Sequence, residues 1–181
     1  MSLQKKIASG ISLILLLAAC HKEDGINLFK HVDAEGWQKN DTLVFDIPAT
    51  EEDADYDLQI QARLTRKYSF ADLWLIAEQT YTEDSTMYAI TDTISTPPED
   101  SVTIEPPHSL TQTINDTIHI AIADENGNMT GNGKSLLEYK QPIRFVRIKK
   151  GTTGAIRIRH IMTPQNIQGI HDIGIELKPL Q

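Results

Sequence analysis

The one cysteine of this chain, Cys20, offers a thiol nucleophile at the end of a distinctive N-terminal segment. It follows a positively charged start, Lys5-Lys6, and an apolar run from Ile11 to Ala19. At nine residues, this run is far shorter than the roughly 20 apolar residues of a membrane-spanning helix, so it is typical of a secretory signal. The small pair Ala18-Ala19 stands directly before this thiol, which is a potential nucleophile.

The tetrapeptide Leu17-Ala18-Ala19-Cys20 resembles the lipobox of bacterial lipoproteins. The resemblance implies a signal peptide at 1–19 and a lipidated tether at 20–28, in which Cys20 carries acyl chains such as palmitate. A buried core cysteine and a plain secretory signal are the alternatives. His21-Lys22-Glu23-Asp24 resembles a surface-export signal, or forms a simple polar tether. We therefore expect anchoring in the cell envelope, on the periplasmic face or at the cell surface.

Charge and cysteine count exclude several classes of protein. The chain has 25 acidic and 17 basic side chains and a formal charge of −8. It has no dense basic cluster that could neutralise phosphates, so nucleic acid is not an expected partner. A single cysteine forms no intramolecular disulfide and no CxxC motif.

The other residue types that could do chemistry lack the spacing of known motifs. The six histidines show no HxH, HxxxH or HExxH pattern, and no GxSxG or phosphate-binding loop occurs. The acidic segments 53–57 and 124–128 lack the later glycine and glutamate of a calcium loop, so we interpret them as a solvated strand start and a β-turn. We expect no catalytic residue, metal or cofactor, although folding could still assemble a carboxylate pair.

Five tripeptides begin with Asp followed by Ser or Thr. They resemble the O-glycosylation acceptor of exported proteins in one bacterial phylum, which would place sugars on Thr42, Ser85, Thr93, Ser101 and Thr117. The alternative is that a turn acid followed by a β-branched and an aliphatic residue simply starts a strand. The residues alone leave both interpretations open.

Alternation of period two dominates the chain after the tether and predicts half-buried strands. The expected strands are 42–47, 56–64, 72–77, 87–94, 118–122, 143–148, 156–159 and 173–177. His160 is in phase with Ile156 and Ile158, which favours a hydrogen-bonded core histidine over a general base or ligand. The dipeptide Asn126-Gly127 predicts a turn, the proline-rich segment 96–107 predicts a loop, and 135–138 is a candidate helical turn.

Several short strands with regular turn signals predict an all-β fold. We expect an antiparallel β-sandwich, Ig-like or jelly-roll-like, that occupies residues 29–181 as a single domain behind the signal peptide. Within it, Trp37 and Trp74 are expected core anchors, and Asp172 beside Gly174 is expected to fix the turn into the last strand.

The ordered set of segments resembles the GldH gliding-motility lipoproteins. The likeness runs from about Phe29 to Leu177 and rests on segments 36–45, 68–75, 91–94, 124–133, 160–162 and 167–175. Met129 and Thr163 depart from the family pattern, which has an aromatic and a basic residue at these places. The resemblance implies a membrane-anchored, non-catalytic accessory of the gliding apparatus and its linked secretion machinery, with envelope proteins as partners. Only Cys20 carries over as a functional residue.

Two other functions stay open at this point. An envelope lipoprotein that binds a ligand such as a glycan would present Trp37 or Trp74 on a concave surface. An enzyme would need a cleft in which acids converge, or His160 beside an acid.

Overall fold

The structure, a computed structural model, describes residues 25–83 and 109–180. Every regular element in these two ranges is a β-strand. The described residues therefore contain no helix that could span a membrane. The strands are β1 (Ile26–His31), β2 (Trp37–Gln38), β3 (Leu43–Ile47), β4 (Ala54–Leu64), β5 (Asp72–Glu83), β6 (Leu110–Ala121), β7 (Leu137–Ile148), β8 (Thr153–His160), β9 (Asn166–Ile167) and β10 (Ile170–Pro179).

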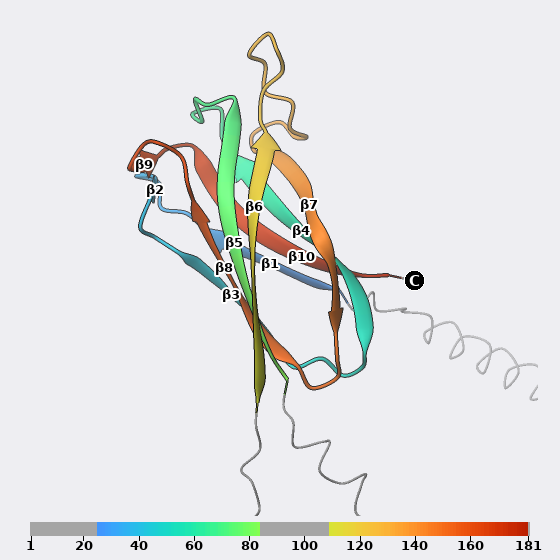
Figure 1. Ribbon diagram of the computed structural model, residues 1–181. Helices are drawn as coiled ribbons and strands as arrows, with labels where there is room; N and C mark the ends of the chain where they lie inside the picture. The colour runs from blue at the N-terminus through green and yellow to red at the C-terminus, as the bar shows by residue number, and fades with distance from the viewer. Residues whose placement is uncertain (1–24, 84–108, 181) are drawn as a thin grey trace, which may run out of the picture.

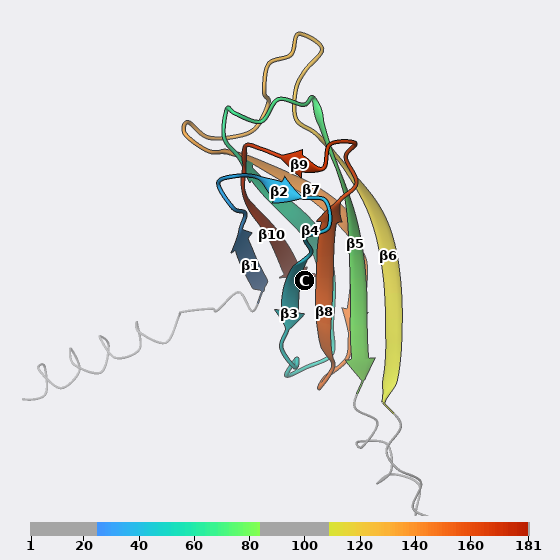
Figure 2. The ribbon, with the colours of Figure 1, turned by 90° about the vertical axis from the view of Figure 1, so that its left-hand side faces the viewer.

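Two four-stranded antiparallel sheets form a sandwich (Figure 1). The strand orders are β1-β10-β4-β7 and β3-β8-β5-β6, and β2 pairs with β9 at one end of the molecule (Figure 2). The predicted antiparallel sandwich is therefore confirmed.

A single apolar core lies between the sheets, and the predicted alternation produces it. In β4 the fully buried side chains are Leu58, Ile60, Ala62 and Leu64. Strand β8 contributes Ile156 and Ile158, and β10 contributes Ile173, Ile175 and Leu177. Burying one such side chain is worth about 1.5–3 kcal/mol, which makes this core the main source of stability.

His160 is a core residue, as its phase predicted. It is fully buried, its Nε2 lies 3.2 Å from the carbonyl oxygen of Trp37, and its ring meets the indole of Trp37 edge to face at 5.4 Å. Trp37 is 2% exposed and donates its own Nε1 hydrogen to the carbonyl of Asp41. The two rings therefore close the core beneath the β2-β9 ladder.

The turn at Asn126-Gly127 is also confirmed. One carboxylate oxygen of Asp124 accepts hydrogen bonds from the backbone N–H groups of Asn126 and Asn128, at 2.9 and 2.8 Å. Gly127 has a φ of 81°, which glycine adopts without strain. The Asn128 hydrogen bonds in particular hold the pKa of Asp124 below its ordinary value.

Some element boundaries differ from the predictions. The segment 135–138 contains no helical turn, because β7 begins at Leu137 and pairs with β4. Strand β6 begins at Leu110, eight residues before the expected start. Its early residues are mostly exposed and lack apolar alternation, but they pair with the extended end of β5 through the backbone.

The first strand begins at Ile26, within the range expected for the tether. Ile26 and Leu28 pack against the core, which draws these residues into the sheet. The expected strand at 87–94 and the expected loop at 96–107 lie outside the described residues.

Candidate functional site

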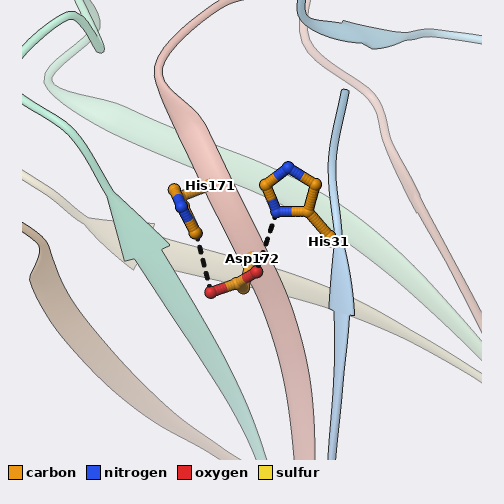
Figure 3. Close-up of side chains that lie close together, drawn as sticks. All are labelled: His31, His171 and Asp172. Atoms are coloured by element: carbon orange, nitrogen blue, oxygen red, sulfur yellow. Dashed lines mark hydrogen bonds and ion pairs between the residues drawn. The ribbon is translucent and has the colours of Figure 1, made fainter. Parts of the chain in front are cut away.

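Three side chains from the two ends of the chain meet on the outer face of one sheet. Asp172 of β10 is the register partner of His31 of β1. His31 Nδ1 lies 3.2 Å from Asp172 Oδ1, and His171 Nδ1 lies 2.8 Å from Asp172 Oδ2 (Figure 3). We call these three residues the histidine cluster.

A β-bulge allows the neighbours His171 and Asp172 to act together. Successive residues of a regular strand point to opposite faces. In the ladder between β10 and β4, however, Ile170 pairs with Leu64 and Asp172 pairs with Arg63, so His171 is an extra residue. Bulges of this kind re-aim side chains, and this one brings the ring of His171 to the carboxylate of Asp172.

The cluster is supported by a stack on the same face. The ring of Phe29 lies against Gly174, where an added Cβ would stand 2.6 Å from two ring carbons. The guanidinium of Arg63 lies over that ring at 3.8 Å from its centroid. It is also 3.9 Å from a carboxylate oxygen of Asp172 and 3.9 Å from one of Glu138. Asp172 therefore lies within β10, where it bonds to His31 of β1 and faces Arg63 of β4. The expectation that Asp172 fixes a turn before the last strand is wrong.

The surroundings favour a charged Asp172. Its side chain is 15% exposed, and this burial alone raises the pKa. The hydrogen bonds from His171 and His31 outweigh burial, so the pKa lies below its ordinary value. His31, His171 and Asp172 each offer one atom that could bind a metal ion, and these three atoms lie within 4.8 Å of one another. Sequence spacing missed this group because His31 and Asp172 are 141 residues apart; the adjacent pair His171-Asp172 was the one local signal.

A second surface lies on the outer face of the β3-β8-β5-β6 sheet. Trp74 is 41% exposed, so the expectation that it is a core anchor is wrong. Its indole stacks on the imidazole of His119, with ring centroids 4.3 Å apart, and His119 Nε2 lies 2.5 Å from a carboxylate oxygen of Asp72. Trp74 points outward because its neighbours Leu73 and Leu75 fill the core side of β5.

A shallow hollow of about 120 Å³ opens on the same face. It is lined by Thr42, Ile76, Glu78, Asn115, Arg157 and Arg159. Arg157 is engaged with Glu78 at 3.5 Å, whereas Arg159 makes no ion pair among the described residues. We call this surface, with Trp74, His119 and the hollow, the Trp74 face.

The predicted modification sites fall partly on the Trp74 face. Thr42 lines the hollow, and Thr117 is the register partner of Ile76; both are exposed. An acceptor must be exposed, but the modification itself stays a prediction. Cys20, Ser85, Thr93 and Ser101 lie outside the described residues.

Comparison with known families decides the relationship. The GldH lipoprotein family matches residues 26–97 and 101–177, which include most of the described strands. The chain belongs to the GldH lipoprotein family. GldH lipoproteins are associated with gliding motility, and membership implies a membrane-anchored envelope protein. No curated protein matches the chain.

Solved structures resemble this GldH lipoprotein only distantly. A Sulfurospirillum deleyianum protein is 10% identical, with 86% of this chain and 99% of that chain covered and a TM-score of 0.42. An aminopeptidase from a marine sediment Thaumarchaeota archaeon is 11% identical, with 87% and 31% covered and a TM-score of 0.33. The Eiger TNF of S. frugiperda is 11% identical, with 85% and 92% covered and a TM-score of 0.23. These likenesses are too low to carry an inference.

Proposed function

We propose that this GldH lipoprotein is a non-catalytic accessory of the gliding-motility apparatus and its associated protein-secretion machinery. Acyl chains on Cys20 hold it in the membrane, and the sandwich binds an envelope protein of that machinery through the Trp74 face. Anchoring confines the encounter to a surface and so raises the effective concentration of the partners.

The exposed Trp74 carries this proposal. Trp and Arg are enriched among residues that dominate protein interfaces. Here Trp74 is 41% exposed although it is fixed by His119, and Arg157 and Arg159 lie on the same face. A fixed aromatic ring loses little conformational entropy on binding. The partner that fits this face presents an apolar side chain to Trp74 and an acidic group to Arg159.

In-cell crosslinking tests the proposal. The tagged lipoprotein is crosslinked, purified and analysed by mass spectrometry for its partners. We expect gliding or secretion envelope proteins, with recovery reduced at least tenfold by Trp74→Ala. Phe145→Ala is the matched control, because Phe145 is an aromatic residue 72% exposed on the other sheet. Equal recovery from both variants would remove the Trp74 face from the proposal.

Membrane anchoring has its own test. Cys20→Ala should leave the protein in the soluble fraction and abolish recovery of the envelope partners. If the variant stays in the membrane pellet after a salt wash, lipid attachment at Cys20 does not explain retention.

Glycan binding is the second candidate function, and the same tryptophan favours it. A sugar ring can stack on an exposed indole, and the hollow beside Ile76 supplies amide, carboxylate and guanidinium groups for hydroxyls. A glycan array would reveal it. Trp74-dependent binding to sugars, together with recovery of no gliding or secretion protein, would replace the proposed function with this one.

A further inference from the structure

We propose that the histidine cluster binds a divalent transition-metal ion, with Zn²⁺ as the representative ion. His31, His171 and Asp172 would be the protein ligands. The ion would join β1 to β10 on the outer face of the sheet. The inference is independent of the proposed function, and its failure would leave that function standing.

The type of ligand selects the class of ion. Two imidazoles with one carboxylate suit Zn²⁺, Cu²⁺ or Ni²⁺, whereas Ca²⁺ and Mg²⁺ prefer shells of oxygen. Three protein ligands leave one position of a tetrahedral ion for water or an outside ligand. His31 and His171 have side chains 63% and 41% exposed, so an ion can reach the cluster from solvent.

Two of the distances between ligand atoms are close to those of such a site. Zinc binds nitrogen and oxygen at about 2.0–2.2 Å, so neighbouring ligands of a tetrahedral ion stand roughly 3.3 Å apart. The two nitrogen–oxygen distances at Asp172 are 3.2 and 2.8 Å, and one ligand atom from each residue lies within 4.8 Å of the others. Figure 3 shows both imidazoles beside the carboxylate of Asp172. Rotation of these side chains would bring the ligand atoms to the separation that an ion needs.

Arg63 sets the electrostatics on the other side of the carboxylate. Strand β10 lies between β1 and β4, so Arg63 approaches Asp172 from the side opposite His31. Its guanidinium rests on Phe29, is shared with Glu138 and faces Oδ2 of Asp172, the oxygen that His171 also approaches, whereas His31 approaches Oδ1. An ion held by both histidines would therefore compete with Arg63 for Oδ2. A positive charge 3.9 Å from the ligand weakens cation binding, so removing it should tighten binding.

The position of the site gives the ion a structural role. β1 is an edge strand whose one neighbour in its sheet is β10, and it begins six residues after Cys20. His31 is the last residue of β1. An ion held by His31 and Asp172 would therefore fasten the strand that follows the membrane anchor to the body of the sandwich.

Calorimetry on the purified lipoprotein in detergent tests the proposal. The protein carries a tag without histidine, is stripped with chelator and is titrated with Zn²⁺, and with Ca²⁺ as the oxygen-preferring comparison. We expect one Zn²⁺ per chain, no comparable Ca²⁺ binding, and a Tm that rises with Zn²⁺ concentration because the ion binds the folded state. Co²⁺ in place of Zn²⁺ should show visible absorption bands of a nitrogen-bound ion.

Single variants assign the ligands. His31→Ala and His171→Ala should each weaken Zn²⁺ binding at least tenfold, and Arg63→Gln should tighten it. His119→Ala is the matched control. His119 also pairs with an aspartate, Asp72, at 2.5 Å, but it belongs to no group of three possible metal ligands among the described residues. Circular dichroism verifies folding, and both ligand histidines are exposed enough to be removed without opening the core. Absence of Zn²⁺ binding, or binding unchanged in both ligand variants, would overturn the proposal.

Discussion

Gly174 should be intolerant of any side chain, and the main cause is one aromatic ring. A Cβ built at this position lies 2.6 Å from Cδ1 and Cε1 of Phe29 and 2.9 Å from the carbonyl oxygen of Leu28. Carbon atoms in favourable contact are about 3.5–4.0 Å apart, so in Gly174→Ala the ring must move by about 1 Å. That movement disturbs the Arg63 guanidinium stacked on it.

The expected cost follows from comparable changes in packed interiors. An added methyl group that forces neighbours to shift costs about 1–3 kcal/mol. For a domain of this size, that lowers Tm by about 2–12 °C. Thermal unfolding of the wild type and Gly174→Ala, followed by far-UV circular dichroism, measures the shift.

A double-mutant cycle isolates the ring as the cause. In a Phe29→Ala background, Gly174→Ala should cost less by at least about 1 kcal/mol, because only the contact with the Leu28 carbonyl remains. If the cost is the same with and without the ring, the contact with Phe29 is not its cause.

Three further predictions concern the core and the Trp74 face. Burial lowers the pKa of His160 below 6.5, so His160 binds a proton more tightly in the unfolded chain than in the folded one. The folded state is therefore favoured by this residue above about pH 6.5, and it loses this contribution to the free energy of unfolding as the pH falls below that value. Urea unfolding at pH 5 and 7.5 should therefore show a larger loss at low pH in the wild type than in His160→Gln, and equal losses would contradict this account. Trp37→Ala should cost about 3–5 kcal/mol, since it removes a buried indole and leaves a cavity; a urea-unfolding loss below 1 kcal/mol would show that the site collapses freely. Intact-mass analysis of native protein should show sugar that is reduced by Thr42→Ala and Thr117→Ala, and no added mass would end the glycosylation prediction.

Glycosylation and partner binding are also linked by position. Thr42 and Thr117 lie on the Trp74 face, so sugars there would compete with a partner that docks on it. The intact-mass measurement would therefore also show whether this surface is free for recognition.

Local patterns in the sequence were sufficient to predict the fold class, and they also predict the anchor at Cys20. The predicted signal segment and its cysteine are contiguous in the sequence. Period-two alternation predicts which side of a strand faces the core, as the buried residues Ile156, Ile158 and His160 illustrate. Polar strand segments gave no such signal: the start of β6 is mostly exposed and became a strand through backbone pairing with β5.

Tertiary structure alone decided the two surfaces. Trp74 resembles a core residue by type, and its exposure follows from which side of β5 faces the sandwich. The histidine cluster needs a register that places His31 beside Asp172 across 141 residues, and a bulge that turns His171 to the same carboxylate. Neither event is a local property of the chain, because strand pairing and bulges are set by the packing of the whole sheet.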